Sequence, residues 1–378
     1  MPQVNINTSY TRQDPVTAPP PAGGGIGNNP QFAAFLGTAR VNTFRNQVSL
    51  SQVLFAGFRI IDGIRLANIN VNAAEEEYRK TRQEVVFNVS NAYYNTLKAY
   101  QLVEVLKFSL KQAEIHLEQS KKFEKAGTGL KVDVLRANNQ LINVQMQLSQ
   151  AINNYEKAKK SLNLVMGRAI DTPIEMNLKP EIPDIDLDEN KFIKLALDNR
   201  SELRQLKIKK EIDEILVTIQ SRTTWPTISA NLSYNLTDQA VVNGNAVNIQ
   251  NLNYGINMNW PIFDGLLTQA KVQKAQNTVI QDQISIDQLQ QSIILEVKQN
   301  ILDLQEAKER MIMASESIKL AEESLRLSKI RYDSGVGLNI EVIDAQNNLN
   351  QAKSNFINAE YDFNINKVKL YKAVGIDI

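Results

Sequence analysis

The sequence contains no cysteine and only one histidine among its 378 residues. The lack of cysteine excludes disulfide bonds and cysteine-ligated metal sites. Zinc sites usually need several ligands of these types, so we expect His116 to be a surface or packing residue and expect no metal or other cofactor. The chain also lacks a Ser–His pair and a phosphate-binding loop, so it is not predicted to be an enzyme.

An excess of charge of one sign is also missing. The 42 basic and 41 acidic residues leave a net charge of +1, whereas a nucleic-acid-binding protein needs a basic face, so no nucleic-acid partner is expected. No run of about 18 apolar residues is present that could form a transmembrane helix. No signal peptide is visible either, and a strand is predicted directly after Met1. We therefore expect an N-terminal helix and a signal peptide to be absent from this chain.

What the sequence does contain is an internal repeat. The segment "KAGTGLKVDVLRANN" (125–139) is matched by "RYDSGVGLNIEVIDAQN" (331–347), and the offset of 208 residues continues over more than 100 residues. The matched pairs include Gly57 with Gly265, Gly127 with Gly335, Gly129 with Gly337, Leu117 with Leu325 and Gly167 with Gly375. An offset without gaps indicates long uninterrupted elements, because loops vary in length more than helices do.

Each copy of the repeat contains a long segment with helical periodicity. Between 265 and 333, apolar or small residues recur in steps of three and four, namely Val297, Ile301, Leu304, Ala307, Met311, Ala314, Ile318, Ala321 and Leu325. This spacing predicts a helix of roughly 100 Å, with a counterpart at 58–124. Shorter return helices are predicted at 131–166 and 339–374. A helix this long needs partner helices along its length.

Two β-hairpins are predicted, at 1–55 and 226–262, with loops at 11–43 and 237–251. Their strands of about 10 residues alternate between apolar residues and Asn, Ser, Thr or Gly, which fits a transmembrane β-strand or one sheet of a soluble sandwich. The nearly uncharged polar face favours a water-filled lumen. Because four strands cannot close a barrel and open edges are not tolerated in lipid, three chains with twelve strands are expected.

The predicted organisation is therefore a first repeat (1–168), a proline-bearing connector (169–190) and a second repeat (191–378). The second repeat also carries a helix, at 191–221, that the first repeat lacks. Three aromatic residues of the hairpins could lie at a membrane interface, namely Trp225, Trp260 and Tyr254.

In the order and spacing of several short motifs the chain resembles the TolC-like outer membrane efflux protein family. The motifs are the paired "AGTGL" and "SGVGL" turns, "WPIFDG" (260–265), "ALDNRSEL" (196–203), and the terminal "VMG" and "AVG". The resemblance covers essentially the whole chain. It implies a mainly helical, duplicated fold with β-hairpins, in which a homotrimer forms a 12-stranded transmembrane barrel and an α-helical tunnel.

The resemblance also implies a function. The trimer would be a passive exit duct in the outer membrane lipid that extends into the periplasm and exports small molecules or polypeptides. It would work with a periplasmic adaptor (membrane fusion) protein and an inner-membrane pump in a tripartite efflux or type I secretion system. The alternative is a periplasmic adaptor or coiled-coil scaffold without channel activity, which also has long helical hairpins.

The family's functional positions can be carried over onto the two turns. The adaptor would dock on the tip, at Gly127, Thr128, Gly129, Gly335, Val336 and Gly337. The family's two gate aspartates fall on Glu341 and Asp344, and its gate tyrosine falls on Tyr332. Asp133 is the first-copy counterpart of Glu341, whereas Arg136 stands where Asp344 would be. Gly337 stands where the family has an arginine, so the closing network is expected to differ here.

The carboxylates have two interpretations. In a trimer, Glu341 and Asp344 would place six carboxylates around a narrow axis, where they attract cations. Acidic residues in the first turn of a helix are also common because they stabilise the helix N-terminus. The glycines have a similar alternative, since glycine is frequent at helix C-termini.

Overall fold

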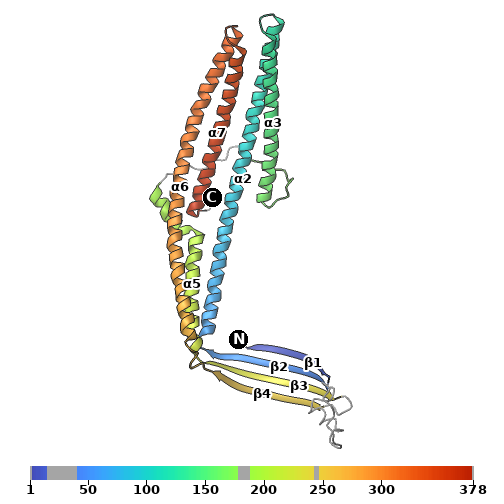
Figure 1. Cartoon of the computed structure of the whole chain (residues 1–378), viewed down its shortest axis with the longest axis vertical. Coiled ribbons are helices and arrows are strands. Elements are labelled where there is room, and N and C mark those ends of the chain that lie inside the picture. Colours follow the sequence, from blue (N-terminus) through green and yellow to red (C-terminus); the bar gives the residue numbers. More distant parts are fainter. Residues whose placement is uncertain (1, 15–40, 178–187, 242–246, 377–378) are drawn as a thin grey trace, which may run out of the picture. The chain divides into compact units, whose positions relative to one another are not determined.

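The computed structural model describes residues 2–14, 41–177, 188–241 and 247–376. The strands are β1 (Gln3–Gln13), β2 (Val41–Ala56), β3 (Thr227–Val241) and β4 (Val247–Asn259). The helices are α2 (Arg59–Lys125), α3 (Lys131–Val165), α4 (Glu189–Asn199), α5 (Ser201–Ser221), α6 (Leu267–Asp333) and α7 (Asn339–Val374) (Figure 1). None of the helices in this described part has the length and apolar run that a membrane crossing requires.

The backbone carries the duplication that the sequence predicts. α2 and α6 each have 67 residues, and their first residues lie 208 positions apart. Among the described residues, every glycine with a positive φ pairs with another at this offset: Gly57 with Gly265, Gly127 with Gly335, and Gly167 with Gly375. Positive φ is rare outside glycine, yet Phe58 and Leu266 also form such a pair. The same turns therefore occur twice, which confirms the predicted fold class.

The chain forms two compact units, and α2, α5 and α6 contribute to both. The sheet unit comprises Met1–Val71 and Lys210–Gln281, and the helical unit comprises Asn72–Lys209 and Asp282–Ile378. This division by contacts differs from the division into sequence repeats, which stays a prediction.

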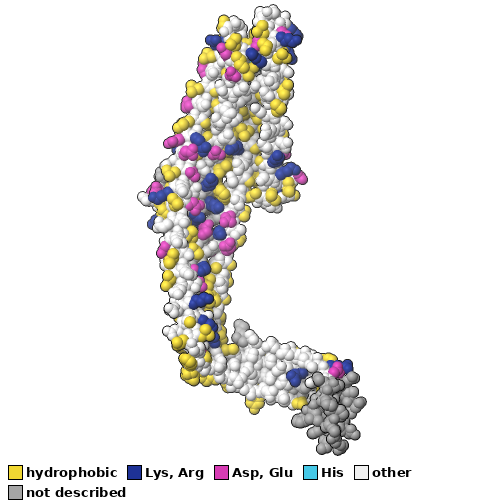
Figure 2. Space-filling model, viewed as in Figure 1, with side chains coloured by type: hydrophobic (Ala, Val, Ile, Leu, Met, Phe, Trp, Pro, Cys, Tyr) yellow, Lys and Arg dark blue, Asp and Glu magenta, His cyan; other side chains and the backbone are white. Residues whose placement is uncertain are grey.

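In the sheet unit, the strands form one antiparallel sheet in the order β1-β2-β3-β4. The register aligns apolar residues across all four strands in the rows Val4, Leu50, Leu232, Tyr254 and Ile6, Val48, Tyr234, Leu252. These side chains are exposed or half-buried. The alternate rows are Asn5, Ser49, Ser233, Asn253 and Asn7, Gln47, Asn235, Asn251. The sheet face seen in Figure 2 is mostly white, the colour of the backbone and of side chains that are neither hydrophobic nor charged.

The strands extend further than the alternation of residue types predicts. Thr11 pairs with Thr43, and Asp238 pairs with Asn248, inside segments that the sequence assigns to loops. Polar cross-strand pairs continue the hydrogen-bonded ladder there without an apolar signal. Residues 15–40 and 242–246 of the predicted loops lie outside the described residues.

In the helical unit, the apolar seam of α6 forms the core. Val297, Ile301, Leu304 and Ala307 are buried, as predicted. The first three pack in one cluster with residues of α4 and α7. Each fully buried leucine or isoleucine stabilises such a cluster by about 1.5–3 kcal/mol. This cluster therefore fixes the relative positions of α4, α6 and α7.

The helix predicted for 191–221 is interrupted at Arg200, which separates α4 from α5. Arg200 has an extended backbone (φ −65°, ψ 121°), and its Nε lies 3.3 Å from Glu202 Oε2. Its guanidinium also pairs with Glu296 of α6. The break thus lets one buried arginine bind carboxylates on two helices. Residues 178–187 of the predicted connector lie outside the described residues.

Candidate functional site

The turns that join α2 to α3 and α6 to α7 have the same hydrogen bonds and lie at the same end of the helical unit (Figure 1). The N–H groups of Gly127 and Thr128 donate to the carbonyls of Glu124 and Phe123, each at 3.0 Å. In the second turn, Gly335 and Val336 donate to Tyr332 and Arg331, also at 3.0 Å. A left-handed glycine with this pair of bonds ends a helix and satisfies its last carbonyls. The two turns therefore have the same hydrogen bonds and the same left-handed glycine.

The second glycine of each turn is required by close approach. A Cβ at Gly337 would lie 2.8 Å from Arg331 Cβ, and one at Gly129 would lie 2.9 Å from Phe123 Cβ. No side chain fits at such distances without a backbone shift. An arginine at position 337 is therefore incompatible with this turn.

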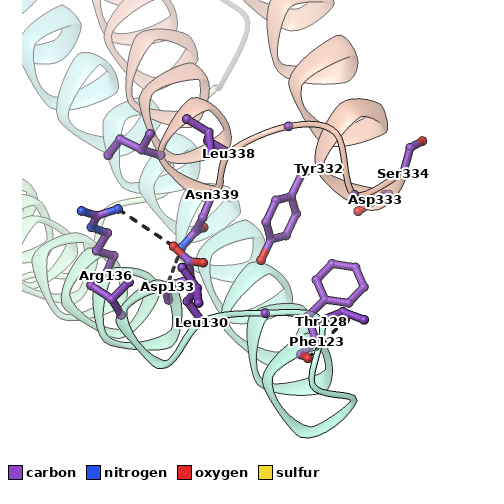
Figure 3. Close-up of a pocket in the computed structure, with 15 residues that line it drawn as sticks. Phe123, Thr128, Leu130, Asp133, Arg136, Tyr332, Asp333, Ser334, Leu338 and Asn339 are labelled. Carbon is purple, nitrogen blue, oxygen red and sulfur yellow. Dashed lines mark hydrogen bonds and ion pairs between the residues drawn. The ribbon is translucent and has the colours of Figure 1, made fainter.

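A cavity of about 480 Å³ lies between the two turns (Figure 3). Of the predicted tip and gate residues, it brings together Thr128, Gly129, Asp133, Tyr332, Gly335 and Gly337. Gly127, Val336, Glu341 and Asp344 do not line it. The predicted site is thus divided between a shared cavity and the surface around it.

Tyr332, the predicted gate tyrosine, is buried between the two copies. Its hydroxyl lies 3.3 Å from Ser120 Oγ, and its ring contacts the rings of Phe123 and His116, with 5.3 Å between centroids in each case. In Figure 3 the side chain points from α6 toward the α2–α3 hairpin. Burial raises the pKa of Tyr332, so its hydroxyl remains protonated.

His116 and Asn339 form a buried link that the sequence did not predict. His116 Nε2 lies 2.5 Å from Asn339 Oδ1, and Asn339 Nδ2 donates to the carbonyl of Asp133 at 2.8 Å. One amide therefore connects α2, α3 and α7. Burial lowers the pKa of His116, which favours the neutral imidazole. The signal for this role is helical position, because His116 follows Ala113 by three residues and precedes Leu117, both in the repeated seam.

The predicted gate carboxylates differ in their surroundings. Glu341 Oε2 lies 3.4 Å from Arg331 Nε, and Asp133 Oδ1 lies 4.0 Å from an Arg136 nitrogen. Asp344 is exposed. Leucine occupies the N-cap of both α3 and α7, with no side-chain cap bond among the described residues. Arg331 thus supplies a positive charge near the turn that the sequence analysis missed.

The predicted interface aromatics all belong to the sheet unit. Tyr254 and Trp260 are strongly exposed. Trp225 is partly exposed and packs edge-on against Phe58, with 5.9 Å between ring centroids. Their membrane-interface role stays a prediction.

The sequence model of the outer membrane efflux protein family matches residues 1–168 and 192–376. The chain belongs to the outer membrane efflux protein family. Both matched ranges include one long helix, one turn with two glycines and one return helix. Membership therefore rests on both copies of the repeat.

Individual members of the family are distant in sequence. Outer membrane protein TolC of Salmonella enteritidis is 21% identical over 323 residues, which cover 83% of this chain and 65% of that protein. TolC of Escherichia coli K12 is 21% identical over 311 residues, which cover 79% and 62%. The chain thus spans slightly less than two thirds of the length of these relatives. The CmeC outer membrane channel of Campylobacter jejuni matches with a TM-score of 0.75 and 19% identity, covering 99% of this chain and 78% of CmeC, which shows a common fold.

Proposed function

We propose that this chain is one protomer of a homotrimeric, passive exit duct of a tripartite efflux or secretion system. The observation that carries the proposal is the sheet, which exposes aligned apolar rows on one face and aligned Asn, Ser and Gln rows on the other. An exposed apolar face of this size needs an apolar surrounding. The name of the family, outer membrane efflux protein, indicates that this apolar surrounding would be the outer membrane.

The edges of the sheet support assembly. β1 and β4 are the edge strands, so the outer hydrogen-bonding groups of each are available to another chain. In lipid these groups must be paired, and three chains supply the twelve strands of a closed barrel. The amide rows would then face a water-filled lumen, and Trp225, Trp260 and Tyr254 would lie at the membrane interfaces.

The tip would bind a periplasmic adaptor protein that couples the duct to an inner-membrane pump, which supplies the energy. A Cβ at Gly127 or Gly335 would meet no atom of the described residues within 4 Å, and Val336 is strongly exposed. Thr128 lies between the two glycines of the first turn. Gly127, Gly335 and Val336 would therefore offer an open surface to a partner, and Gly129 and Gly337, which pack closely on the preceding helix turn, would keep the two turns in shape.

The gate would lie beside the tip, and cations would pass or be held at the carboxylates. Asp344 is exposed and lies one helical turn from Glu341, whose charge Arg331 partly offsets. Tyr332 and Asp133 line the cavity between the hairpins and would keep the two copies packed in the closed state.

The experiment that tests this function compares two neighbouring positions of β4. Ile256→Arg places a charge on the apolar face, which costs roughly 2–4 kcal/mol at the middle of a bilayer, whereas Asn257→Arg places it on the amide face. We expect Asn257→Arg to yield a detergent-requiring trimer that conducts ions in planar bilayers, and Ile256→Arg to lose membrane assembly. A wild-type chain that is a monomer without detergent and does not conduct would favour the adaptor or scaffold alternative.

A further inference from the structure

The face of the sheet that carries the amide rows is almost free of charge. The charged side chains of the four described strands are Arg12, Arg45 and Asp238. The register places Arg12 and Asp238 in rows of the apolar face. Arg45 lies in a row of the amide face, between Ser9 of β1 and Thr237 of β3. Over the described strands, the amide face therefore has a single charged group, and this group is positive.

Arg45 has no carboxylate that neutralises it. Its side chain is exposed and makes no hydrogen bond or ion pair with the part of the chain that the structure describes. Arg12, in contrast, has its Nε 3.3 Å from Asp14 Oδ1. A guanidinium has five N–H donors and is not deprotonated in proteins. The donors of Arg45 are thus available to an anion from outside the chain.

The neighbours of Arg45 supply further donors. Residues directly opposite each other in an antiparallel pair have Cβ atoms about 4.5–5.5 Å apart, and Ser9 and Thr237 both carry a hydroxyl group. Thr43 and Gln47 lie two residues away along β2, on the same face. An anion at Arg45 would therefore meet hydroxyl and amide groups and no carboxylate among these nearest side chains.

We propose that Arg45, with Ser9 and Thr237, forms an anion-binding row that holds carboxylate or phosphate groups of an organic cargo. This inference rests on the homotrimeric barrel proposed above, in which the amide face lines the lumen. The planar fork of a guanidinium matches two oxygens of a carboxylate or phosphate group, and the two hydroxyls would donate to the remaining lone pairs. The sheet part of the duct then favours anions.

Three copies of the chain would place three Arg45 side chains at one level of the lumen. Twelve strands about 4.8 Å apart and tilted by roughly 40° enclose a backbone cylinder about 24 Å across. Each Arg45 Cα would be about 12 Å from the axis, and the side chain extends inward from there. Each guanidinium would then lie within about one Debye length of the axis, roughly 8 Å, so an anion on the axis is attracted by all three charges.

Block by citrate, a tricarboxylate, tests the proposal in planar bilayers that contain the full-length trimer. Citrate is added from the side of the β1–β2 loop, because Arg45 lies near that end of β2. It should reduce the single-channel conductance of the wild type. Arg45→Gln, which resembles the surrounding amides, should raise the half-blocking concentration roughly tenfold, as expected for the loss of a charge-assisted hydrogen bond. Arg45→Lys keeps the charge without the planar fork, so its half-blocking concentration should lie between the two.

Arg12→Gln is the matched control, because it removes the same charge from the opposite face of the sheet. It should leave the block by citrate unchanged. The reversal potential in a gradient of potassium chloride is a second measurement, which Arg45→Gln should shift toward cation permeation and Arg12→Gln should not.

Conducting trimers that citrate does not block, or in which Arg45→Gln behaves like the wild type or like Arg12→Gln, overturn the anion-binding row and leave the duct intact. A chain that forms no conducting trimer overturns both the row and the duct.

Discussion

The imidazole Nε2 of His116 lies 2.5 Å from the amide Oδ1 of Asn339, and both side chains are buried. His116 belongs to the long helix of the first copy, and Asn339 is the first residue of the return helix of the second copy. Their repeat counterparts are Ser324 and Lys131, so the pair is specific to the junction within the chain. The otherwise similar copies therefore differ in chemistry where they meet.

Removing this bond should weaken the helical unit. Asn339→Ala leaves the buried imidazole N–H without its acceptor, and an unsatisfied buried polar group costs about 1–3 kcal/mol. We expect the free energy of unfolding, measured by denaturant titration of the detergent-solubilised protein, to fall by that amount. Lys319→Ala removes an exposed ion pair and should change it by less than about 0.5 kcal/mol. Equal effects of the two variants would show that the buried bond does not stabilise the fold.

The same histidine should make stability depend on pH. Burial, together with Lys329, lowers the pKa of His116 below its ordinary value of about 6.5, although Asn339, Asp333 and Asp133 oppose the shift. The unfolded chain therefore binds a proton at His116 at a higher pH than the folded chain does. As the pH falls below about 6.5 toward the folded pKa, protonation favours unfolding and the free energy of unfolding decreases.

A comparison with His116→Gln isolates this contribution, since glutamine keeps hydrogen-bonding groups and does not titrate. Unfolding titrations at several pH values between about 7 and 4 should show a smaller decrease for the variant than for the wild type. Parallel pH profiles of the two proteins would mean that His116 takes up its proton equally in both states.

The sequence predicted the fold well because the backbone conformation itself requires the residues that mark the repeat. Gly127 and Gly335 adopt a left-handed conformation, and Gly129 and Gly337 leave no room for a Cβ, so these residues mark the turns in any sequence with this backbone. The apolar seam from Val297 marks the long helix for a similar reason, since burial requires that period. The break at Arg200 was missed because one of the two carboxylates that bind its guanidinium, Glu296, lies 96 residues away in the sequence.

The site was less predictable than the fold. Tyr332 could be aligned with a family position, but its contacts with His116 and Ser120 come from a helix more than 200 residues away. Arg331 was missed as the partner of Glu341, since the two lie across a turn whose geometry sequence alone does not give. Periodicity identifies which face of a helix is buried, whereas polar pairs between helices depend on their relative register.

Replacing glycine by alanine should have opposite effects on stability in a turn and inside a helix. Gly337→Ala puts a Cβ 2.8 Å from Arg331 Cβ and the Tyr332 nitrogen, so we expect a loss of roughly 1–3 kcal/mol in the free energy of unfolding. Gly63→Ala is the matched control, because Gly63 lies inside α2 and its Cβ would meet no atom of the described residues within 4 Å. It should raise the free energy of unfolding by about 0.5–1 kcal/mol. A neutral Gly337→Ala would show that the turn accommodates a side chain.

The proposed gate predicts unequal roles for its two carboxylates. Arg331 lies 3.4 Å from Glu341, whereas Asp344 is exposed, so Asp344 should contribute more of the negative potential that attracts cations. We expect Asp344→Asn to weaken block by a trivalent cation roughly tenfold, about 1.4 kcal/mol, and Glu341→Gln to weaken it less. Single-channel conductance in planar bilayers, with the cation added from the tip side, measures both.

Asp171→Asn is the control for the gate experiment, since Asp171 is a strongly exposed carboxylate paired with Lys160 and far along the chain from the turns. The trivalent cation should block the Asp171→Asn channel as strongly as it blocks the wild-type channel. The same block in Asp344→Asn and in Asp171→Asn would place the cation site elsewhere and leave Asp344 as a residue that only stabilises the start of α7. A larger effect of Glu341→Gln than of Asp344→Asn would instead mean that Arg331 releases Glu341 in the assembled duct, because an exposed ion pair of this kind contributes at most about 1 kcal/mol.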